Sequence, residues 1–217
     1  MIDALWDEAT GVIRVARAED GATLWAHGWY GRDPRTRGAP GRTAPTAPHE
    51  HAVLMPCEAF YLSVLLPAPV LCVRAAATRA VLDAAAQWAA YAALDPAFPA
   101  QLALYRDCRA AGWAPRAGVA HGVDLLLYRP GAHHSHAPFA AVLVRDAAAP
   151  LPAGVAHAAR NVGNVAKQLL VCHIDALPPA NAPWSRAALD AARVEMTVLA
   201  RWDPDADRDP PTPLHHQ

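Results

Sequence analysis

Two apolar runs of strand length, joined by a short polar turn, constrain the fold of this chain more than any other feature. The first run, VDLLLYR, ends near Tyr128, and the second, APFAAVLVR, begins just after His136. The segment between them, PGAHHS, carries the proline and glycine that favour tight turns. The pattern predicts a β-hairpin that brings Tyr128 and His136 within reach of one small ligand.

A single lysine adds a chemical argument. Lys167 is the only lysine, and the rest of the 19 Lys and Arg residues are arginines. Lysine and arginine are not interchangeable where a compact, desolvatable charge is needed. Lys167 ends a predicted helix, residues 154–167, on a face that it shares with Arg160. That helix should pack across the same sheet as the hairpin.

Tyr128, His136 and Lys167 together supply a phenol, an imidazole and an ammonium group. Without clustered carboxylates, these groups make a poor metal site. They suit metal-free proton transfer around a phosphodiester, in which the cation stabilises charge on the phosphate oxygens. From spacing alone, ordinary packing for the tyrosine and solvation for the histidine remain open.

Composition excludes several classes of function. The net charge of −1 gives no global basic field, so binding of RNA would need a local patch or partner proteins. No apolar run reaches the ~18–20 residues of a membrane span, and the acidic N-terminus lacks the basic start of a signal peptide. The four cysteines have no CxxC spacing and fit free, buried thiols better than disulfides or a zinc site: Cys57, Cys72, Cys108 and Cys172.

The predicted fold class is α+β, with a domain boundary at the prolines Pro96 and Pro99. Residues 1–98 form a small N-terminal α/β domain, in which residues 31–51 are a flexible Pro/Gly-rich loop. Residues 99–203 form a second domain with a mixed, mostly antiparallel sheet and flanking helices. The tail, residues 204–217, is predicted to be disordered.

Within the N-terminal domain, GVIRVARA, ATLWAHGWY and PVLCVRA are predicted as strands. The segments LMPCEAFYLSVLL and TRAVLDAAAQWAAYAAL are predicted as helices, and Glu58 is interpreted as a buried or capping residue at the start of the first. In the second domain, the helix AQLALYRDCRAAG should end at Gly112. QLLVCHID is predicted as a buried strand and PPANAPWSRAALDAAR as a connection.

The last predicted strand, RVEMTVLARW, alternates cleanly. One face carries five apolar residues: Val194, Met196, Val198, Ala200 and Trp202. Such a strand is a natural edge for pairing with a partner chain. Asp124 and Arg116 are interpreted as structural residues that support the hairpin, and Trp113 as part of the core.

The histidines of HHSH, residues 133–136, invite an alternative interpretation as a metal site. No cysteine or carboxylate with ligand spacing stands nearby, and two adjacent histidines cannot easily face one ion. Exposed loop histidines are therefore favoured. A metalloprotein would lose its fold or activity in a chelator.

The block YRDCRAAGWAPRAGVAHGVDLLLYRPGAHHSHAPFAAVLV, followed by ARNVGNVAKQLLVCHID, resembles the catalytic domain of the tRNA-splicing endonuclease. It is most similar to the eukaryotic catalytic subunit assigned to the 5′ splice site. The family pattern extends from Tyr105 to Cys172, and Ala132 stands where the family usually has proline. Upstream, LMPCEAFYLSVLL resembles the family segment L-S-x-E-E-A-F-F-L, with a different start.

The resemblance implies a role for each candidate residue. Tyr128 would be the general base that deprotonates the 2′-hydroxyl, and His136 the general acid that protonates the 5′-oxygen leaving group. Lys167 would stabilise the pentacoordinate transition state, with no metal or other cofactor. Arg160 would clamp a flipped intron base by cation–π stacking, opposed by Trp202, for which simple packing is the alternative.

The resemblance also implies partners. The chain would excise introns from precursor tRNA in a nuclear heterotetramer, with a second catalytic subunit and two structural subunits. The alternatives are the sister catalytic subunit for the 3′ splice site, a structural subunit of the same complex, or a homo-oligomer. The intact Tyr/His/Lys set argues against the structural subunit.

Overall fold

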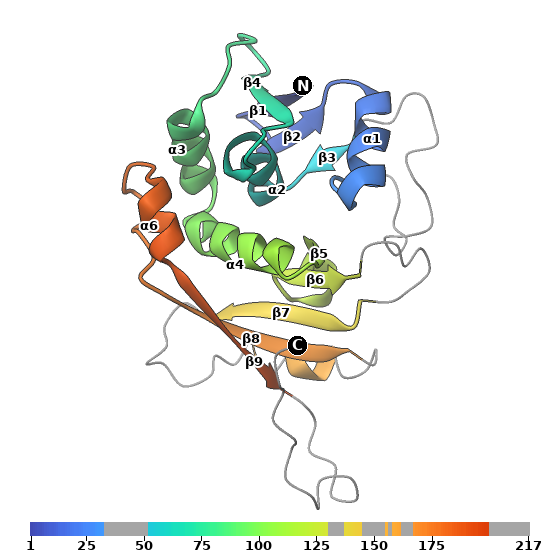
Figure 1. Ribbon diagram of the computed structural model, residues 1–217, viewed down its shortest axis with the longest axis vertical. Helices are drawn as coiled ribbons and strands as arrows, with labels where there is room; N and C mark the ends of the chain where they lie inside the picture. Colours follow the sequence, from blue (N-terminus) through green and yellow to red (C-terminus); the bar gives the residue numbers. More distant parts are fainter. Residues whose placement is uncertain (33–51, 130–136, 145–154, 156–157, 162–166, 200–217) are drawn as a thin grey trace, which may run out of the picture.

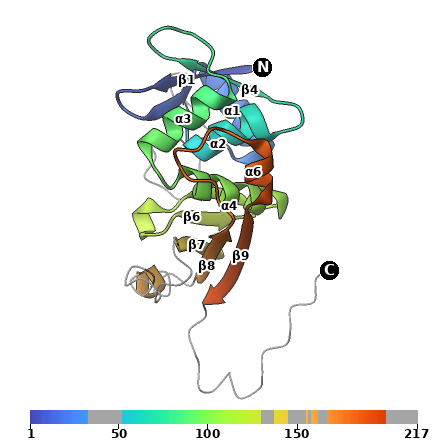
Figure 2. The same ribbon diagram turned by 90° about the vertical axis from the view of Figure 1, so that its left-hand side faces the viewer.

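Two sheets and the helix between them make up the architecture of this chain, seen in a computed structural model (Figures 1 and 2). The model describes residues 1–32, 52–129, 137–144, 155, 158–161 and 167–199. A four-stranded sheet comes from the N-terminal part, and a five-stranded sheet comes from the rest of the chain. Helix α4 (Phe98–Ala110) lies between them.

The N-terminal sheet has the strand order β3-β2-β1-β4. β1 (Ile2–Asp7) pairs antiparallel with β2 (Val12–Val15), and β2 pairs with the short β3 (Val53–Leu54). β4 (Leu71–Ala75) runs parallel to β1. Arg32 adds an isolated bridge to Val53, so the predicted loop 31–51 begins with sheet pairing, and residues 33–51 lie outside the described part.

Helix α1 (Ala18–Gly28) corrects one prediction. The segment ATLWAHGWY was predicted as a strand after a turn at EDG, but EDG lies in the first turn of this helix. Glu19 and Asp20 favour that position because a helix N-terminus attracts negative charge. Gly21 and Leu24, three residues apart, form the buried face.

The two predicted N-terminal helices are present. α2 (Pro56–Phe60) continues into the π-helical turn η1 (Tyr61–Leu65). As interpreted from the sequence, Glu58 is buried and caps the start of α2, where its Oε2 accepts the Met55 N–H at 2.9 Å. α3 (Ala84–Leu94) begins later than predicted, where Asp83 accepts the Ala86 N–H at 2.8 Å.

The five-stranded sheet has the order β5-β6-β7-β8-β9. Its neighbours are antiparallel except for β7 and β8, which confirms the predicted mixed, mostly antiparallel sheet. A parallel pair needs a crossover connection, and the connection here includes helical residues 155 and 158–161. The strands are β5 (Ala114–Ala117), β6 (Leu125–Tyr128), β7 (Phe139–Val144), β8 (Gln168–Asp175) and β9 (Arg193–Leu199).

Helix α4 ends as predicted. Gly112 has φ 80° and its N–H bonds to the oxygen of Arg109 at 3.0 Å, which is the left-handed geometry of a helix end. A 3-10 turn, η2 (Val119–His121), then leads into β6.

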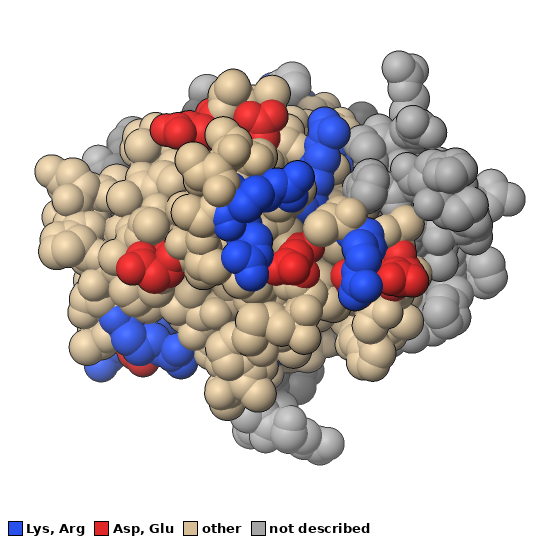
Figure 3. Space-filling view, turned by 90° about the horizontal axis from the view of Figure 1, so that it is seen from above, with Lys and Arg blue, Asp and Glu red and all other residues tan. Residues whose placement is uncertain are grey.

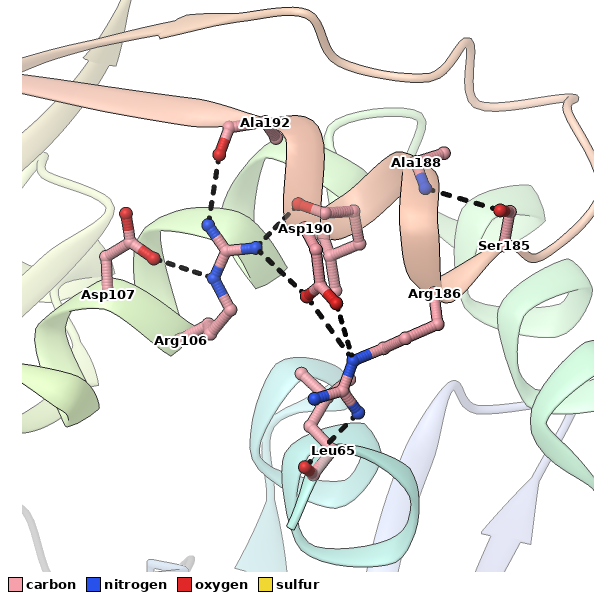
Figure 4. Close-up of polar contacts among 9 residues, drawn as sticks. Leu65, Arg106, Asp107, Ser185, Arg186, Ala188, Asp190 and Ala192 are labelled. Carbon is pink, nitrogen blue, oxygen red and sulfur yellow. Dashed lines mark hydrogen bonds and ion pairs between the residues drawn. The ribbon is translucent and has the colours of Figure 1, made fainter. Parts of the chain in front are cut away.

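Helix α6 (Arg186–Ala191) corrects a second prediction, since PPANAPWSRAALDAAR was expected to be a connection. Ser185 caps this short helix. Arg106 of α4 donates to the oxygens of Leu189 and Ala192, and Arg186 donates to the oxygen of Leu65 (Figure 4). Long-range contacts therefore stabilise a helix that local sequence did not predict.

Three apolar clusters form the interior. One joins the N-terminal sheet to α2, α3, α4 and α6, and it contains Phe98, Leu102 and Tyr105 of α4. The other two cover opposite faces of the five-stranded sheet. α4, which begins at residue 98, therefore packs with the N-terminal part, and the division into residues 1–98 and 99–203 remains a prediction. The tail, residues 204–217, lies outside the described part.

Candidate active site

The ends of three neighbouring strands define the candidate site. Tyr128 is the last residue of β6, and Lys167 directly precedes β8. β7 lies between these strands, where Phe139 is opposite both Leu127 of β6 and Gln168 of β8. Tyr128 and Lys167 therefore lie at the same end of the sheet, two strands or roughly 10 Å apart along the hydrogen-bonding direction.

The Tyr128 side chain lies on the face of the sheet that is covered by the crossover helix. It is 3% exposed and packs in a cluster with Ala114, Val155 and Ala158. The Trp29 ring, at the end of α1, lies 6.3 Å from the Tyr128 ring at an angle of 50°. Residues far apart in sequence thus enclose the phenol.

Burial raises the pKa of Tyr128 above its usual 10.0, and the positive charge of Arg116 partly opposes that rise. Arg116 lies on β5, where Ala114 pairs with Tyr128 and Arg116 pairs with Leu126, so both side chains lie on the same face. The resting phenol is therefore neutral, and its ionised form would be a strong base.

Arg160 and Lys167 are both accessible. Arg160 is exposed on the crossover helix, opposite the buried Val155 and Ala158, as its helical spacing predicted. Lys167 is half-buried and is not helical, so the prediction that it ends a helix is wrong. Its position at the start of β8 depends on strand pairing, since the Gln168 N–H bonds to the Pro138 oxygen at 3.0 Å.

The other two candidate residues, His136 and Trp202, lie outside the described residues. Ala137, which follows His136, is buried against the Tyr128 side of the sheet. The roles predicted for all five residues therefore stay predictions.

Comparison with protein families decides the class of this domain. Residues 98–177 match the family described as tRNA intron endonuclease, catalytic C-terminal domain. These residues form a catalytic domain of the tRNA intron endonuclease family. The match begins at the first residue of α4 and ends just after β8, so the resemblance seen in the sequence is confirmed.

Curated proteins that are similar to this chain are subunits named Sen2. The mouse protein, tRNA-splicing endonuclease subunit Sen2 of Mus musculus, is 27% identical over 70% of this chain and 34% of its own length. SEN2 of Eremothecium gossypii is 28% identical over 94% of this chain and 54% of its own length. SEN2 of Saccharomyces cerevisiae is 28% identical over 75% and 44%. The chain thus spans a third to about half of the length of these relatives.

Asp124 and Arg116 support the endonuclease domain in different ways. Asp124 Oδ2 accepts the Leu143 N–H at 2.8 Å and so ties β7 to the start of the hairpin, as interpreted from the sequence. Arg116 instead connects the sheet to the N-terminal part. Its guanidinium donates to the oxygen of Trp29 and lies 3.6 Å from the Glu58 carboxylate.

Trp113 is not a core residue, contrary to the interpretation from the sequence. It is half-buried, and its ring meets Phe139 edge-on at 5.4 Å. The exposed Arg129, next to Tyr128, places its guanidinium 5.6 Å from the Trp113 ring.

Sequence reasoning missed Trp25 and Trp29, the aromatic residues of α1 on the Tyr128 side. Their rings stack in parallel at 5.6 Å, four residues apart on one helix face. That i, i+4 spacing was a usable signal, but it was hidden by the assignment of the segment to a strand.

The four cysteines are free, as predicted, and three of them are buried. Among the described residues, no group of three or more His, Cys, Asp and Glu side chains could hold a metal ion. The HHSH histidines are not among those residues, so the alternative metal site is not tested. No helix in the same part of the chain is long and apolar enough to cross a membrane.

The face at the N-terminal end carries both signs of charge (Figure 3). Arginines there pair with carboxylates, as in the bond from Arg74 to Asp3 at 2.9 Å and from Arg17 to Asp20 at 2.9 Å. Among the described residues of this face, positive and negative charges therefore alternate, unlike the basic patch of a non-specific RNA-binding protein.

Proposed function

We propose that this chain is a catalytic subunit of a tRNA-splicing endonuclease that cuts precursor tRNA at the 5′ splice site. One observation carries the proposal: in a tRNA intron endonuclease domain, strand pairing brings Tyr128 and Lys167 to the same end of the sheet. Ala137, which follows His136 in the sequence, precedes β7 at that end as well. Relatives named Sen2 support the assignment to this type of subunit.

The chemistry is an internal transesterification at the scissile phosphate. Tyr128, as phenolate, takes the proton of the neighbouring 2′-hydroxyl, whose oxygen attacks phosphorus. The bond from phosphorus to the 5′-oxygen breaks, and His136 gives its proton to that oxygen. The products are a 2′,3′-cyclic phosphate and a 5′-hydroxyl, and Lys167 stabilises the charge that builds on the phosphate oxygens.

The environment of Tyr128 limits the active fraction of the enzyme. Its pKa is raised above 10.0, so the phenol is mostly protonated near neutral pH. Histidine usually has a pKa of about 6.5, so the imidazole is mostly deprotonated at the same pH. The active form is therefore a minor species, and its low population must be offset by accurate positioning of both groups.

Recognition of the splice site uses stacking. The exposed guanidinium of Arg160 can lie against the face of a flipped base, and Trp202 is the proposed opposite wall. The requirement for a 2′-hydroxyl and a splayed base restricts the substrate to RNA with an unpaired bulge or loop.

The partners proposed are a second catalytic subunit and two structural subunits in a heterotetramer. β9 supports a contact with another chain because it is the last strand of its sheet and pairs only with β8 among the described strands. Its apolar residues Met196, Val198 and Leu199 are each 38–42% exposed. An apolar edge strand of this kind favours pairing with another polypeptide.

Cleavage of an intron-containing precursor tRNA by the reconstituted complex, with EDTA present, tests the proposal. Wild type should cut both splice sites without a divalent metal. Lys167→Ala should slow the 5′ cut by ~10²–10³-fold and leave the 3′ cut unchanged. Arg14→Ala, which removes an exposed cation from the N-terminal sheet, is the matched control and should cut like wild type.

Each alternative gives a different result. Loss of the 3′ cut in Lys167→Ala would identify the sister subunit, and no change at either site would indicate a structural subunit. A requirement for a divalent metal would support the alternative of a metal site at the HHSH histidines, residues 133–136. Continued cutting after replacement of the 2′-hydroxyl with hydrogen would point to water as the nucleophile. Nuclear localisation is part of the proposal, and imaging of the tagged chain in its own cells tests it.

A further inference from the structure

The residue that directly follows α1 has a strained backbone, although it carries a large side chain. Trp29 has φ 57° and ψ 38°, the left-handed conformation that usually belongs to glycine. For residues with a Cβ atom this conformation is unfavourable. Gly28 and Gly31 stand on either side, yet the tryptophan takes that conformation, so contacts of its side chain and backbone must hold it there.

Two arginines of the endonuclease domain hold this helix end. Arg109 of α4 donates to the oxygen of Gly28 at 2.7 Å, and Arg116 of β5 donates to the oxygen of Trp29. Carbonyl oxygens at a helix C-terminus lack helical partners and attract positive charge. The same guanidiniums lie over aromatic rings, Arg109 at 3.9 Å from Tyr30 and Arg116 at 5.1 Å from Trp25.

The docked helix end places the Trp29 indole against the candidate base. The indole is 4% exposed, stacks on Trp25 on one side, and lies 6.3 Å from the Tyr128 ring. Tyr128 is the last residue of β6, where it pairs with Ala114 of β5 and the regular strand ends. The indole supplies a rigid surface against which the phenol can take one rotamer.

We propose that Trp29 is a positioning residue for Tyr128, through which the docked end of α1 fixes the direction of the phenolic oxygen. The inference rests on the proposed function, because it assigns Tyr128 to proton transfer. A displacement of about 1 Å in a reacting group can slow a reaction by ~10²-fold. Trp29 contacts the rings of Trp25 and Tyr128, so its removal should change the rate of the chemical step and leave substrate binding intact.

The test compares two buried tryptophans in full-length chains reconstituted with the partner subunits. Trp29→Leu removes the surface against Tyr128. Trp88→Leu, the control, removes a 2% exposed indole from the N-terminal cluster, where it packs on Phe60 and Phe98. Folded fraction is measured by urea titration, and kcat and KM at the 5′ site are measured per folded complex.

We expect kcat to fall by ~10–100-fold in Trp29→Leu with KM unchanged, and to remain at the wild-type value in Trp88→Leu. Trp29→Phe, which keeps a flat but smaller ring, should lose less than Trp29→Leu, with kcat only several-fold below the wild-type value. A wild-type kcat in Trp29→Leu would overturn the inference, and so would equal losses in both leucine variants.

If Trp29→Leu does not fold, Trp29→Phe decides the question, since a smaller ring should still lower kcat by several-fold with KM unchanged. A wild-type kcat in Trp29→Phe would then overturn the inference. A wild-type complex that does not cut precursor tRNA would instead remove the proposed function, and the role of Trp29 with it.

Discussion

Glu58 and Arg116 form a buried ion pair that joins α2 to β5, with Arg116 Nη1 3.6 Å from Glu58 Oε1. Both side chains are almost inaccessible, at 2% and 6% exposure. Glu58 also accepts the N–H groups of Met55 and Gly31, and Arg116 donates to Trp29. The N-terminal part and the endonuclease domain therefore share a polar network in which each charge depends on the other.

Glu58→Ala should lower the free energy of unfolding by about 3–5 kcal/mol, because it leaves Arg116 buried without its partner charge. Urea titration followed by tryptophan fluorescence measures the change. Arg17→Ala is the control, since it removes an exposed arginine that pairs with Glu19 and Asp20 and should leave the free energy of unfolding almost unchanged. Similar losses in both variants would show that burial does not set the strength of the Glu58–Arg116 pair.

Arg106 should matter far more than Arg186 for the last helix and strand. Arg106 donates to two oxygens at the end of α6, whereas Arg186 is half-exposed and pairs mainly with Asp190 (Figure 4). Arg106→Ala should cost about 2 kcal/mol, and Arg186→Ala under ~1 kcal/mol. Hydrogen exchange over residues 186–199 should speed up in Arg106→Ala alone, and equal protection in the two variants would contradict the assignment.

Buried thiols predict a loss of stability in alkali. Burial raises the pKa of Cys108 and of Cys172 from 9.0 to about 12. Because the folded-state pKa exceeds the unfolded value, their contribution to stability is complete below pH 9 and is lost as pH rises toward 12. Each thiol lowers the free energy of unfolding by up to ~1.4 kcal/mol per pH unit in that range.

Cys108→Ala should therefore flatten the alkaline slope of the free energy of unfolding. Leu104→Ala, in the same cluster, should lower stability equally at all pH values and keep the slope. Urea titrations between pH 7 and 11, roughly the range in which free thiols titrate, separate the two effects. A slope that is identical in wild type and Cys108→Ala would refute the thiol explanation.

Tyr128→Phe and Lys167→Arg should lose the 5′ cut while keeping the fold. The first removes only a hydroxyl from a buried ring, and its rate should fall by ~10²–10⁴-fold. The second keeps the charge but replaces a compact ammonium group with a planar, larger guanidinium. Full activity of Lys167→Arg would show that the reaction does not require a lysine at this position.

The pH dependence of cutting follows from the raised pKa of Tyr128 and from the proton that His136 is proposed to donate. Below the Tyr128 pKa, the phenolate fraction rises tenfold per pH unit, and above the pKa of a histidine, usually about 6.5, the imidazolium fraction falls tenfold per unit. The two trends cancel, so wild type should show a plateau from about pH 6.5 up to the raised pKa of Tyr128. His136→Ala removes the imidazolium group, whose charged fraction falls as pH rises, so the residual rate of this variant should rise with pH. A residual rate that stays flat would argue against Tyr128 as the base.

The strands of the hairpin and the buried strand β8 could be predicted because their signals are local. Alternating or continuous apolar runs and a Pro/Gly turn indicate β6, β7 and β8 without reference to distant residues. Gly112 likewise marks the end of α4 through its own backbone conformation. The family motif then named the chemistry of Tyr128 and Lys167.

Helices α1 and α6 could not be predicted because distant residues stabilise them. α1 carries aromatic residues that also suit strands, and its end is held by Arg109 and Arg116. α6 has six residues, too few for a stable isolated helix, and depends on Arg106. The burial of Tyr128 by Trp29 joins residues 99 positions apart, and no local pattern reports such a contact.

Helix α4 belongs by sequence to the endonuclease domain, but Phe98, Leu102 and Tyr105 complete the interior of the N-terminal part. A fragment that began at residue 98 would expose these side chains to water, and a fragment that ended there would leave an open apolar surface. A cut at residue 98 should therefore lower the stability of both fragments. Any lineage that shortens the region before α4 must supply another surface to cover that side of the helix.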